Sequence, residues 1–192
     1  MSETVNNARI VLKNVRFAYC HVFEKDQLNE KYSARIILPK DHPQVAEVKA
    51  AIKAAAMAGA GRLAGKQVRI SDVLHDGDIE AKSEEFAGAY YLNAKSKNKP
   101  GVVKANTTGI GGKVVEITDP EEFYSGCWGH ASIAFFAFNT GVKAGLGCAL
   151  NNVMKTKDGD YLGGRSSAES EFGDLVGDEA PESFEDDDMP IG

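Results

Sequence analysis

The feature that most constrains the fold is a series of short segments rich in branched and aromatic residues, separated by glycine, proline and asparagine turns. These segments cover residues 8–19, 32–39, 89–97, 101–106, 112–118, 127–139 and 145–156, with a weaker one near 68–70. Such segments favour β-strands, and the turns at residues 98–101 (NKPG) and 109–112 (GIGG) favour hairpins. A further hairpin loop is expected at residues 24–31. The pattern predicts a mainly β protein.

One segment has the period of an amphipathic helix. Its apolar stripe consists of Val45, Val48, Ile52 and Ala55. Asp41 is the expected N-cap, Pro43 suits the first turn, and Gly59 and Gly61 are expected to end the helix. Several strands with one helix fit a small antiparallel barrel or a sandwich. The strand count fits a five-stranded OB-like antiparallel barrel with one packed helix and extra hairpins.

Charge is distributed unevenly along the chain. The net charge is −6, from 22 Lys and Arg and 28 Asp and Glu. Ten of the acids lie within residues 168–192, which contain no Lys or Arg, so residues 1–167 hold 18 acids against all 22 basic residues. This asymmetry favours a basic domain at 1–167 that binds a polyanion, followed by a disordered acidic interaction tail at 168–192. A tail that only raises solubility accounts for the same composition.

The three cysteines are an odd number without C-x-x-C spacing, which predicts reduced, buried thiols. The N-terminus lacks the features of a signal peptide, and the longest apolar run is far shorter than the ~20 residues of a membrane helix. We therefore expect a cytoplasmic protein with no membrane association, no metal and no cofactor.

The segment at residues 89–97 is a candidate nucleic-acid-binding strand. Alternation places Tyr91, Asn93, Lys95 and Lys97 on one face, opposite the apolar face of Tyr90, Leu92 and Ala94. Lys99 and Lys104 follow on the next turn and strand, and Arg35 is one of several basic residues on other predicted strands. Aromatic rings stack on bases while cations contact phosphates, so this face is typical of a single-strand binder. A solvated strand face with extended lysines is the alternative.

The segment at residues 127–139 has two apolar faces. Ile133 and Phe135 share one, and the other contains Trp128, His130, Phe136 and Phe138. Most of these rings are expected in the core, but Trp128 and Phe138 lie near the strand ends, where a ring can form a stacking platform.

Sequence patterns that indicate an enzyme are weaker than those that indicate nucleic-acid binding. Asp76, Asp78 and Glu80 lie close together and are the candidate metal ligands of a nuclease. Acids around a glycine are also common in plain turns. The sequence TGIGGK lacks the spacing of a phosphate-binding loop, and Ser125 lacks the pattern of a nucleophile elbow. No enzymatic activity is predicted.

Several stretches resemble a family of tailed-phage single-stranded DNA-binding proteins. They are DPEEFYSGCWGHASIAFFAFN from Asp119, the following GLGCALNNVMKTKDGDYLGG, and also FAYCHVFEKD, YSARIILPKDHP and KPGV. The resemblance extends over most of residues 8–165, and its most specific part is D-P-x-x-x-Y-S-G-C at 119–127. It implies an OB fold, no enzymatic activity, and a context of replication or recombination. It assigns no individual DNA contacts.

The C-terminal sequence ESFEDDDMPIG is similar to the tail of bacterial single-stranded DNA-binding proteins. In those tails an acidic run is followed by an apolar residue, a proline and a terminal phenylalanine, which Ile191-Gly192 replace here. The candidate partner-binding residues are Glu185, Asp186, Asp187, Asp188, Met189, Pro190 and Ile191.

The sequence thus predicts a phage protein of the host bacterial cytoplasm that binds single-stranded DNA by stacking and phosphate contacts, without sequence readout. Its tail is expected to recruit replication or recombination proteins. The alternatives are the metal-dependent nuclease and a phage structural or interaction protein. Self-association into a homo-oligomer stays open.

Overall fold

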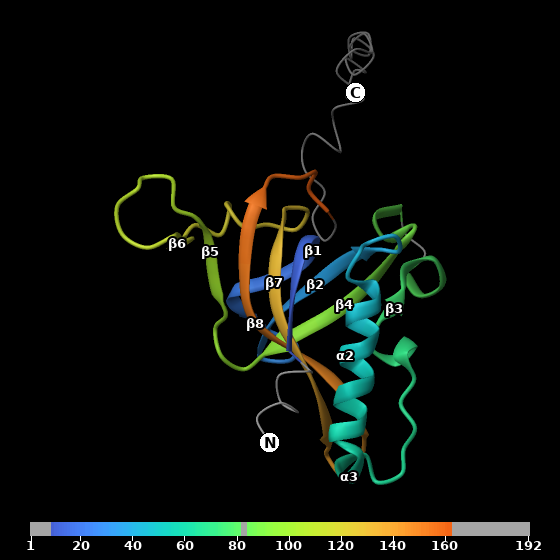
Figure 1. Cartoon of the computed structure of the whole chain (residues 1–192). Coiled ribbons are helices and arrows are strands. Elements are labelled where there is room, and N and C mark those ends of the chain that lie inside the picture. Colours follow the sequence, from blue (N-terminus) through green and yellow to red (C-terminus); the bar gives the residue numbers. More distant parts are fainter. Residues whose placement is uncertain (1–8, 82–83, 163–192) are drawn as a thin grey trace, which may run out of the picture. The chain divides into compact units, whose positions relative to one another are not determined.

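The computed structural model describes residues 9–81 and 84–162. Within these residues eight strands form one sheet: β1 (Arg9–Asp26), β2 (Lys31–Pro39), β3 (His75–Asp76), β4 (Ala89–Ser96), β5 (Gly101–Ala105), β6 (Val114–Glu116), β7 (Trp128–Asn139) and β8 (Ala144–Lys157). The strand order is β3-β4-β2-β1-β7-β8-β5-β6, and a further pairing of β4 with β8 closes five strands into a barrel (Figure 1). The predicted mainly β, OB-like barrel is confirmed.

Closure of the barrel depends on the long, bent strand β1. Its first half pairs with β7 and its second half with β2, and the two halves meet at Arg16. Asn14 and Tyr19 have φ values of 56° and 47°, and the pairing with β2 shifts between Ala18 and His21. Irregularities of this kind bend a strand and increase its twist. The strand continues to Asp26, so the loop predicted at residues 24–31 is shorter than expected.

Parallel pairing completes the barrel, although antiparallel strands were expected throughout. Strands β4 and β8 run parallel and pair at Lys95 and Ala149. Strand β5 also pairs in parallel with β8, and it carries β6 as a hairpin. This β5–β6 arm extends to one side of the barrel in Figure 1.

The core fills the barrel with alternate residues of each strand. The largest fully buried side chains include Leu12, Phe17, Ile36, Leu92, Ile133 and Leu150. Ile133 and Phe135 are buried on the same face of β7, as alternation predicts. Cys127 and Cys148 are buried and Cys20 is partly buried, and all three are free thiols. No helix of the described residues is long and apolar enough to cross a membrane.

Helix α2 (Val45–Ala58) packs on the barrel with Val48, Ala51, Ile52 and Ala55, which confirms most of the predicted stripe. Asp41 is not its N-cap. That position belongs to Gln44, whose side chain accepts from the Lys13 N–H and donates to the Val11 carbonyl. Bonds to β1 therefore fix where the helix begins. The helix ends at Ala58 and Gly59 is its C-cap, where a Cβ would lie 2.2 Å from the Cβ of Ala137. Gly61 does not end a helix as expected but lies within α3 (Ala60–Leu63).

The prediction of a strand near residues 68–70 is wrong. A 3₁₀ turn, η1 (Ile70–Asp72), begins there instead. The Asp72 carboxylate accepts from both the backbone N–H and the side chain of Arg69, and this local pairing favours a turn over a strand. After β3, the π-helical turn η2 (Gly77–Ala81) and the 3₁₀ turn η3 (Glu84–Phe86) lead into β4.

Candidate nucleic-acid interface

Strands β2 and β4 together form a polar face on the barrel. Their antiparallel register pairs Ser33 with Lys95, Arg35 with Asn93, and Ile37 with Tyr91. This register brings Arg35 beside Asn93 and Lys95, on the face of β4 that the sequence predicts to bind nucleic acid. Arg35 Nε donates to Asn93 Oδ1 at 2.8 Å, which orients the guanidinium across the two strands.

Arg35 lies among aromatic rings. Its Cζ is 4.4 Å from the ring centre of Tyr91, 4.9 Å from Tyr19 and 5.3 Å from Phe86. Contacts of this kind between a guanidinium and ring faces are attractive. Tyr19 is 43% exposed, and its positive φ is uncommon for a residue other than glycine. The strained backbone of β1 thus places an open ring over Arg35.

Tyr91 lies beneath this cluster and is not an open ring. Only 7% of it is exposed, because His75 stacks on it at 5.0 Å and Phe86 packs at 5.3 Å. Burial also raises the pKa of its hydroxyl. The prediction that Tyr91 offers a free face to a base is wrong in this conformation, and Tyr19 is the exposed aromatic residue at this place.

Three adjoining hollows follow this face, and we call them together the groove. The first, of about 310 Å³, is lined by Tyr19, His21, Arg35 and Asn93 among others. The second, of about 790 Å³, shares Asn93 and Lys95 with the first and extends to β7 and β8. The third, of about 750 Å³, shares His75, Phe138 and Lys143 with the second. The groove therefore runs from the β1–β2 hairpin, across β4, to the loop between β7 and β8.

Two phenylalanine rings form an aromatic wall in the second hollow. Phe136 is 46% exposed, and its ring centre is 6.5 Å from that of Phe138. Phe136 pairs across the strands with Gly147, and Phe138 with Gly145. A Cβ on Gly147 would lie 2.4 Å from the Phe136 ring, so glycine lets this ring lie across β8. The wall therefore depends on the G-x-G of β8 as much as on the rings.

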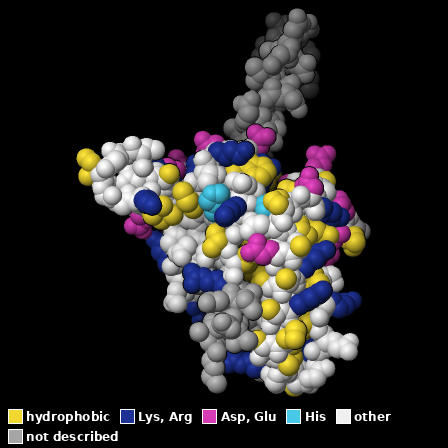
Figure 2. Space-filling view, in the orientation of Figure 1, with side chains coloured by type: hydrophobic (Ala, Val, Ile, Leu, Met, Phe, Trp, Pro, Cys, Tyr) yellow, Lys and Arg dark blue, Asp and Glu magenta, His cyan; other side chains and the backbone are white. Residues whose placement is uncertain are grey.

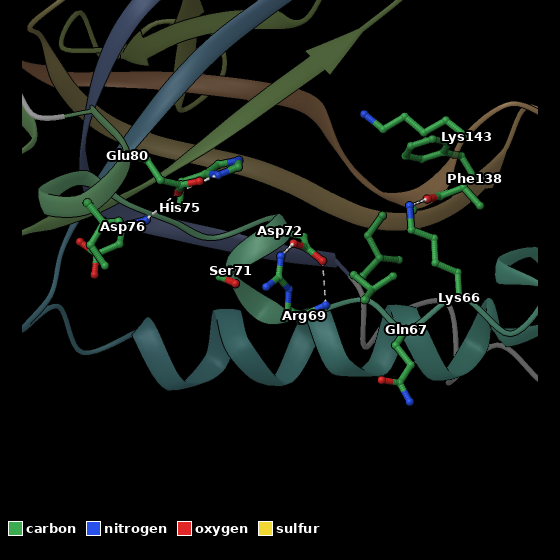
Figure 3. A pocket seen from close by; sticks show the side chains of 15 residues that line it. Lys66, Gln67, Arg69, Ser71, Asp72, His75, Asp76, Glu80, Phe138 and Lys143 are labelled. Atoms are coloured by element: carbon green, nitrogen blue, oxygen red, sulfur yellow. Dashed lines mark hydrogen bonds and ion pairs between the residues drawn. The ribbon is translucent and has the colours of Figure 1, made fainter.

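Basic side chains line the groove along its whole length. Lys31, Lys95, Lys97 and Lys143 border the second hollow, and Arg35 and Lys95 the first. Figure 3 shows the third hollow, where Phe138 and Lys143 face the segment that carries Arg69, Asp72 and His75. Aromatic rings and cations are thus combined in one groove, which is the combination that single-strand binding requires.

Comparison with known proteins identifies the family. Residues 8–188 match the family described as Enterobacter phage Enc34, ssDNA-binding protein. The chain belongs to this family. It is also 30% identical over 188 residues to putative protein p50 of Acyrthosiphon pisum secondary endosymbiont phage 1, covering 87% of this chain and 94% of that protein.

Solved structures share the fold. The single-stranded DNA-binding protein from bacteriophage Enc34, in complex with ssDNA, aligns with a TM-score of 0.68 at 23% identity, over 81% of this chain and 90% of that one. Gp2.5, the single-stranded DNA-binding protein of bacteriophage T7, aligns with a TM-score of 0.52 at 14% identity, over 91% and 98%. The resemblance noted from the sequence is thereby confirmed at the level of the family and the fold.

For this member of the Enc34 family, the metal-dependent nuclease is not supported. Asp76 and Asp78 both pair with Lys40, at 2.9 and 2.7 Å, and this pairing raises the pKa of Lys40 and lowers that of Asp78. Glu80 accepts from the Asp76 N–H and contacts His75. Among residues 9–81 and 84–162, no three His, Cys, Asp or Glu side chains are grouped as a metal site requires. These acids hold the segment before β4 in place.

The structure gathers some predicted contact residues into the groove and leaves others outside it. Arg35, Asn93, Lys95, Lys97 and Phe138 line it, whereas Lys99, Lys104 and Trp128 do not. Lys99 lies over Phe23, and Lys104 forms an ion pair with Glu122. Trp128 is partly exposed, with the cations of Arg16 and Lys157 within 5.6 and 5.0 Å of its ring.

Sequence reasoning missed Tyr19 and did not select Phe136 as a contact. For Phe136 a signal was present, since F-x-F in β7 faces G-x-G in β8. Tyr19 carried no such signal, because its position depends on the bend in β1. The candidate partner-binding residues 185–191 lie outside the described residues.

Proposed function

We propose that this protein binds single-stranded DNA in the groove by base stacking and phosphate contacts, without reading sequence. The observation that carries the proposal is the combination of the exposed rings of Tyr19 and Phe136 with a continuous row of cations. Arg35 and Lys95 lie on β2 and β4, the second and third strands of the barrel, and that face is the part of an OB fold that binds oligonucleotides. Tyr19 on β1 and Phe136 on β7 border it from either side.

The family supports the same ligand, since the Enc34 protein has been solved with ssDNA. We propose that the present chain acts without catalysis in replication or recombination of phage DNA, within the host cell. A strand longer than the groove is proposed to reach Lys99, Lys104 and Trp128. Because Trp128 is the sole tryptophan, its emission should change only with oligonucleotides longer than those that saturate the groove.

The acidic tail is proposed to recruit partners. Residues 168–192 carry ten acids, and a polyanion tethered near a basic groove has a high effective concentration there. Such a tail competes weakly with DNA and is released when DNA fills the groove. The acids at 185–188 would then contact basic residues of a partner protein, and Met189, Pro190 and Ile191 a small apolar pocket.

The decisive experiment is titration with an oligo(dT) labelled at one end. Phe136→Ala with Phe138→Ala should weaken binding by roughly 1–3 kcal/mol for each base that loses its stack. Log affinity of the wild type should fall against log salt by about 0.7 per phosphate contact. Met57→Ala, at an exposed apolar residue of α2, is the matched control. If the double variant binds oligo(dT) as tightly as the wild type, the DNA strand binds to another surface of the protein.

A truncation at residue 167 tests the tail. The shortened protein should bind oligo(dT) more tightly at low salt, and it should capture fewer proteins from infected-cell extract. Equal DNA affinity together with an unchanged set of captured proteins would leave the tail only a solubility role.

A further inference from the structure

Two hairpin tips, one toward each end of the groove, each expose one large aliphatic side chain. Leu28, in the turn between β1 and β2, is 95% exposed. Val142, in the turn between β7 and β8, is 98% exposed. Scattered apolar residues are normal on a protein surface, but these two are almost completely surrounded by solvent. Neither contributes to a core.

Both tips are held rigid by hydrogen bonds from polar neighbours. The Leu28 N–H donates to Asp26 Oδ1 at 2.9 Å, and the Lys31 N–H donates to Asn29 Oδ1 at 3.0 Å. In the other turn, the Gly141 N–H donates to Asn139 Oδ1 and the Lys143 N–H to Thr140 Oγ1. These bonds hold the backbone of each turn, so the Cα positions of Leu28 and Val142 are fixed at the tips, where both side chains are exposed.

The two tips lie toward opposite ends of the groove. Asp26 and Asn29, which flank Leu28, line the first hollow. Thr140 and Lys143, which flank Val142, line the second hollow, and Lys143 also lines the third. A strand that follows the groove therefore passes one tip as it enters and the other as it leaves. Lys31 and Lys143 provide a cation beside each tip for the phosphates at these points.

We propose that Leu28 and Val142 are wedges that open base pairs next to the bound strand. This rests on the proposed function, because the groove must hold the unpaired strand for a tip to meet the adjoining duplex. Apolar side chains inserted between base steps unstack them, and the cost is offset by contacts that the opened strand makes elsewhere. Here those contacts are the stacking and phosphate contacts of the groove. The protein would thus open hairpins actively, and not only trap strands that open by themselves.

The test uses a DNA hairpin with a fluorophore and a quencher on its stem and a dT extension on either the 5′ or the 3′ side. The variants are Leu28→Ser, Val142→Ser and their combination. Ile110→Ser is the matched control, because Ile110, between β5 and β6, is 83% exposed but lines none of the three hollows. The β5–β6 arm projects to the left in Figure 2 and carries hydrophobic side chains. Plain oligo(dT) measures single-strand affinity separately.

The combined variant should need roughly tenfold more protein to open half of the hairpins, while its affinity for oligo(dT) stays within about twofold of wild type. Each single variant should impair mainly one of the two extensions, since the tips meet opposite ends of the strand. Ile110→Ser should open hairpins as wild type does.

Three results would overturn the wedge. The combined variant could open hairpins at wild-type concentrations, it could lose oligo(dT) affinity in the same proportion, or Ile110→Ser could impair opening equally. A wild-type protein that failed to bind oligo(dT) would instead refute the proposed function.

Discussion

Two arginine–aromatic clusters on this barrel have similar composition and different surroundings. At the start of β7, Arg16 lies 5.6 Å from the Trp128 ring, but its Nε donates to the Gly126 carbonyl and its Nη2 to the Asp160 carbonyl. In the groove, Arg35 lies among three rings, and its Nε donates to the side chain of Asn93. Backbone carbonyls fix Arg16 to two chain segments, whereas Arg35 borders an open hollow. From this difference we predict that Arg16 mainly stabilises the fold, whereas Arg35 contributes to the binding proposed for the groove.

The largest effect is expected at Tyr91, the buried ring under Arg35. Tyr91→Ala should lower the free energy of unfolding by roughly 3–5 kcal/mol, as for other buried aromatic residues. Urea unfolding followed by circular dichroism measures it, and Tyr91→Phe, which keeps the ring, is the control. A stable Tyr91→Ala protein with impaired DNA binding would return Tyr91 to the role that the sequence suggested.

The next effect concerns Arg16. Arg16→Ala should lower the free energy of unfolding by roughly 1.5–3 kcal/mol, because hydrogen bonds from a charged donor are lost and two carbonyls lose their partner. Affinity of the folded variant for a short oligo(dT) should be close to wild type. If Arg16→Ala leaves the free energy of unfolding unchanged but lowers the affinity for oligo(dT), Arg16 contributes to binding and the proposed difference between the two arginines is wrong.

Arg35 should show the reverse pattern. Arg35→Gln keeps a polar side chain but removes the charge, so the slope of log affinity against log salt should become shallower by about 0.7. Arg35→Lys keeps the charge and should retain the slope. Stability of both variants is measured alongside, and a loss of stability as large as that of Arg16→Ala would make the two clusters equivalent.

The smallest effect is expected from the ion pair beside the groove. Lys40 and the Gly88 N–H lower the pKa of Asp78 from its ordinary value of 3.8. Because the pKa of Asp78 is lower in the folded than in the unfolded protein, its ionised carboxylate stabilises the fold. This stabilisation is complete above about pH 4 and is lost as the pH falls through the folded pKa. The Tm of the wild type should therefore fall below that pH slightly more steeply than the Tm of Asp78→Asn. Asp41→Asn, at an exposed site outside this cluster, should follow the wild type.

Local sequence pattern predicted most of the fold, because strand alternation and glycine turns are local properties. It placed Tyr91, Asn93 and Lys95 on one face correctly. It could not predict that His75 and Phe86 pack on Tyr91 and bury it, since nothing in the polar sequence around them specifies where it packs. The start of α2 was missed for a related reason, because Gln44 is fixed by bonds to β1 that are distant in sequence.

The site was predictable only where neighbours in sequence are neighbours in space. Lys95 and Lys97 lie on one strand end and reach the groove together. Lys99 and Lys104 are just as close in sequence, but the chain turns into β5 and carries them away from the groove. Arg35 and Phe138 come from strands that are distant in sequence, so their convergence required the barrel to be closed.

That closure rests on a single paired position between β4 and β8, at Lys95 and Ala149. Both residues also line the second hollow, so a strand lying in the groove spans the seam. Where few backbone pairs hold two elements together, local opening costs least and amide hydrogens exchange with solvent soonest. A ligand that binds only the closed form raises that cost by mass action. DNA bound in the groove would thus stabilise the closed barrel and slow amide exchange along β4 and β8.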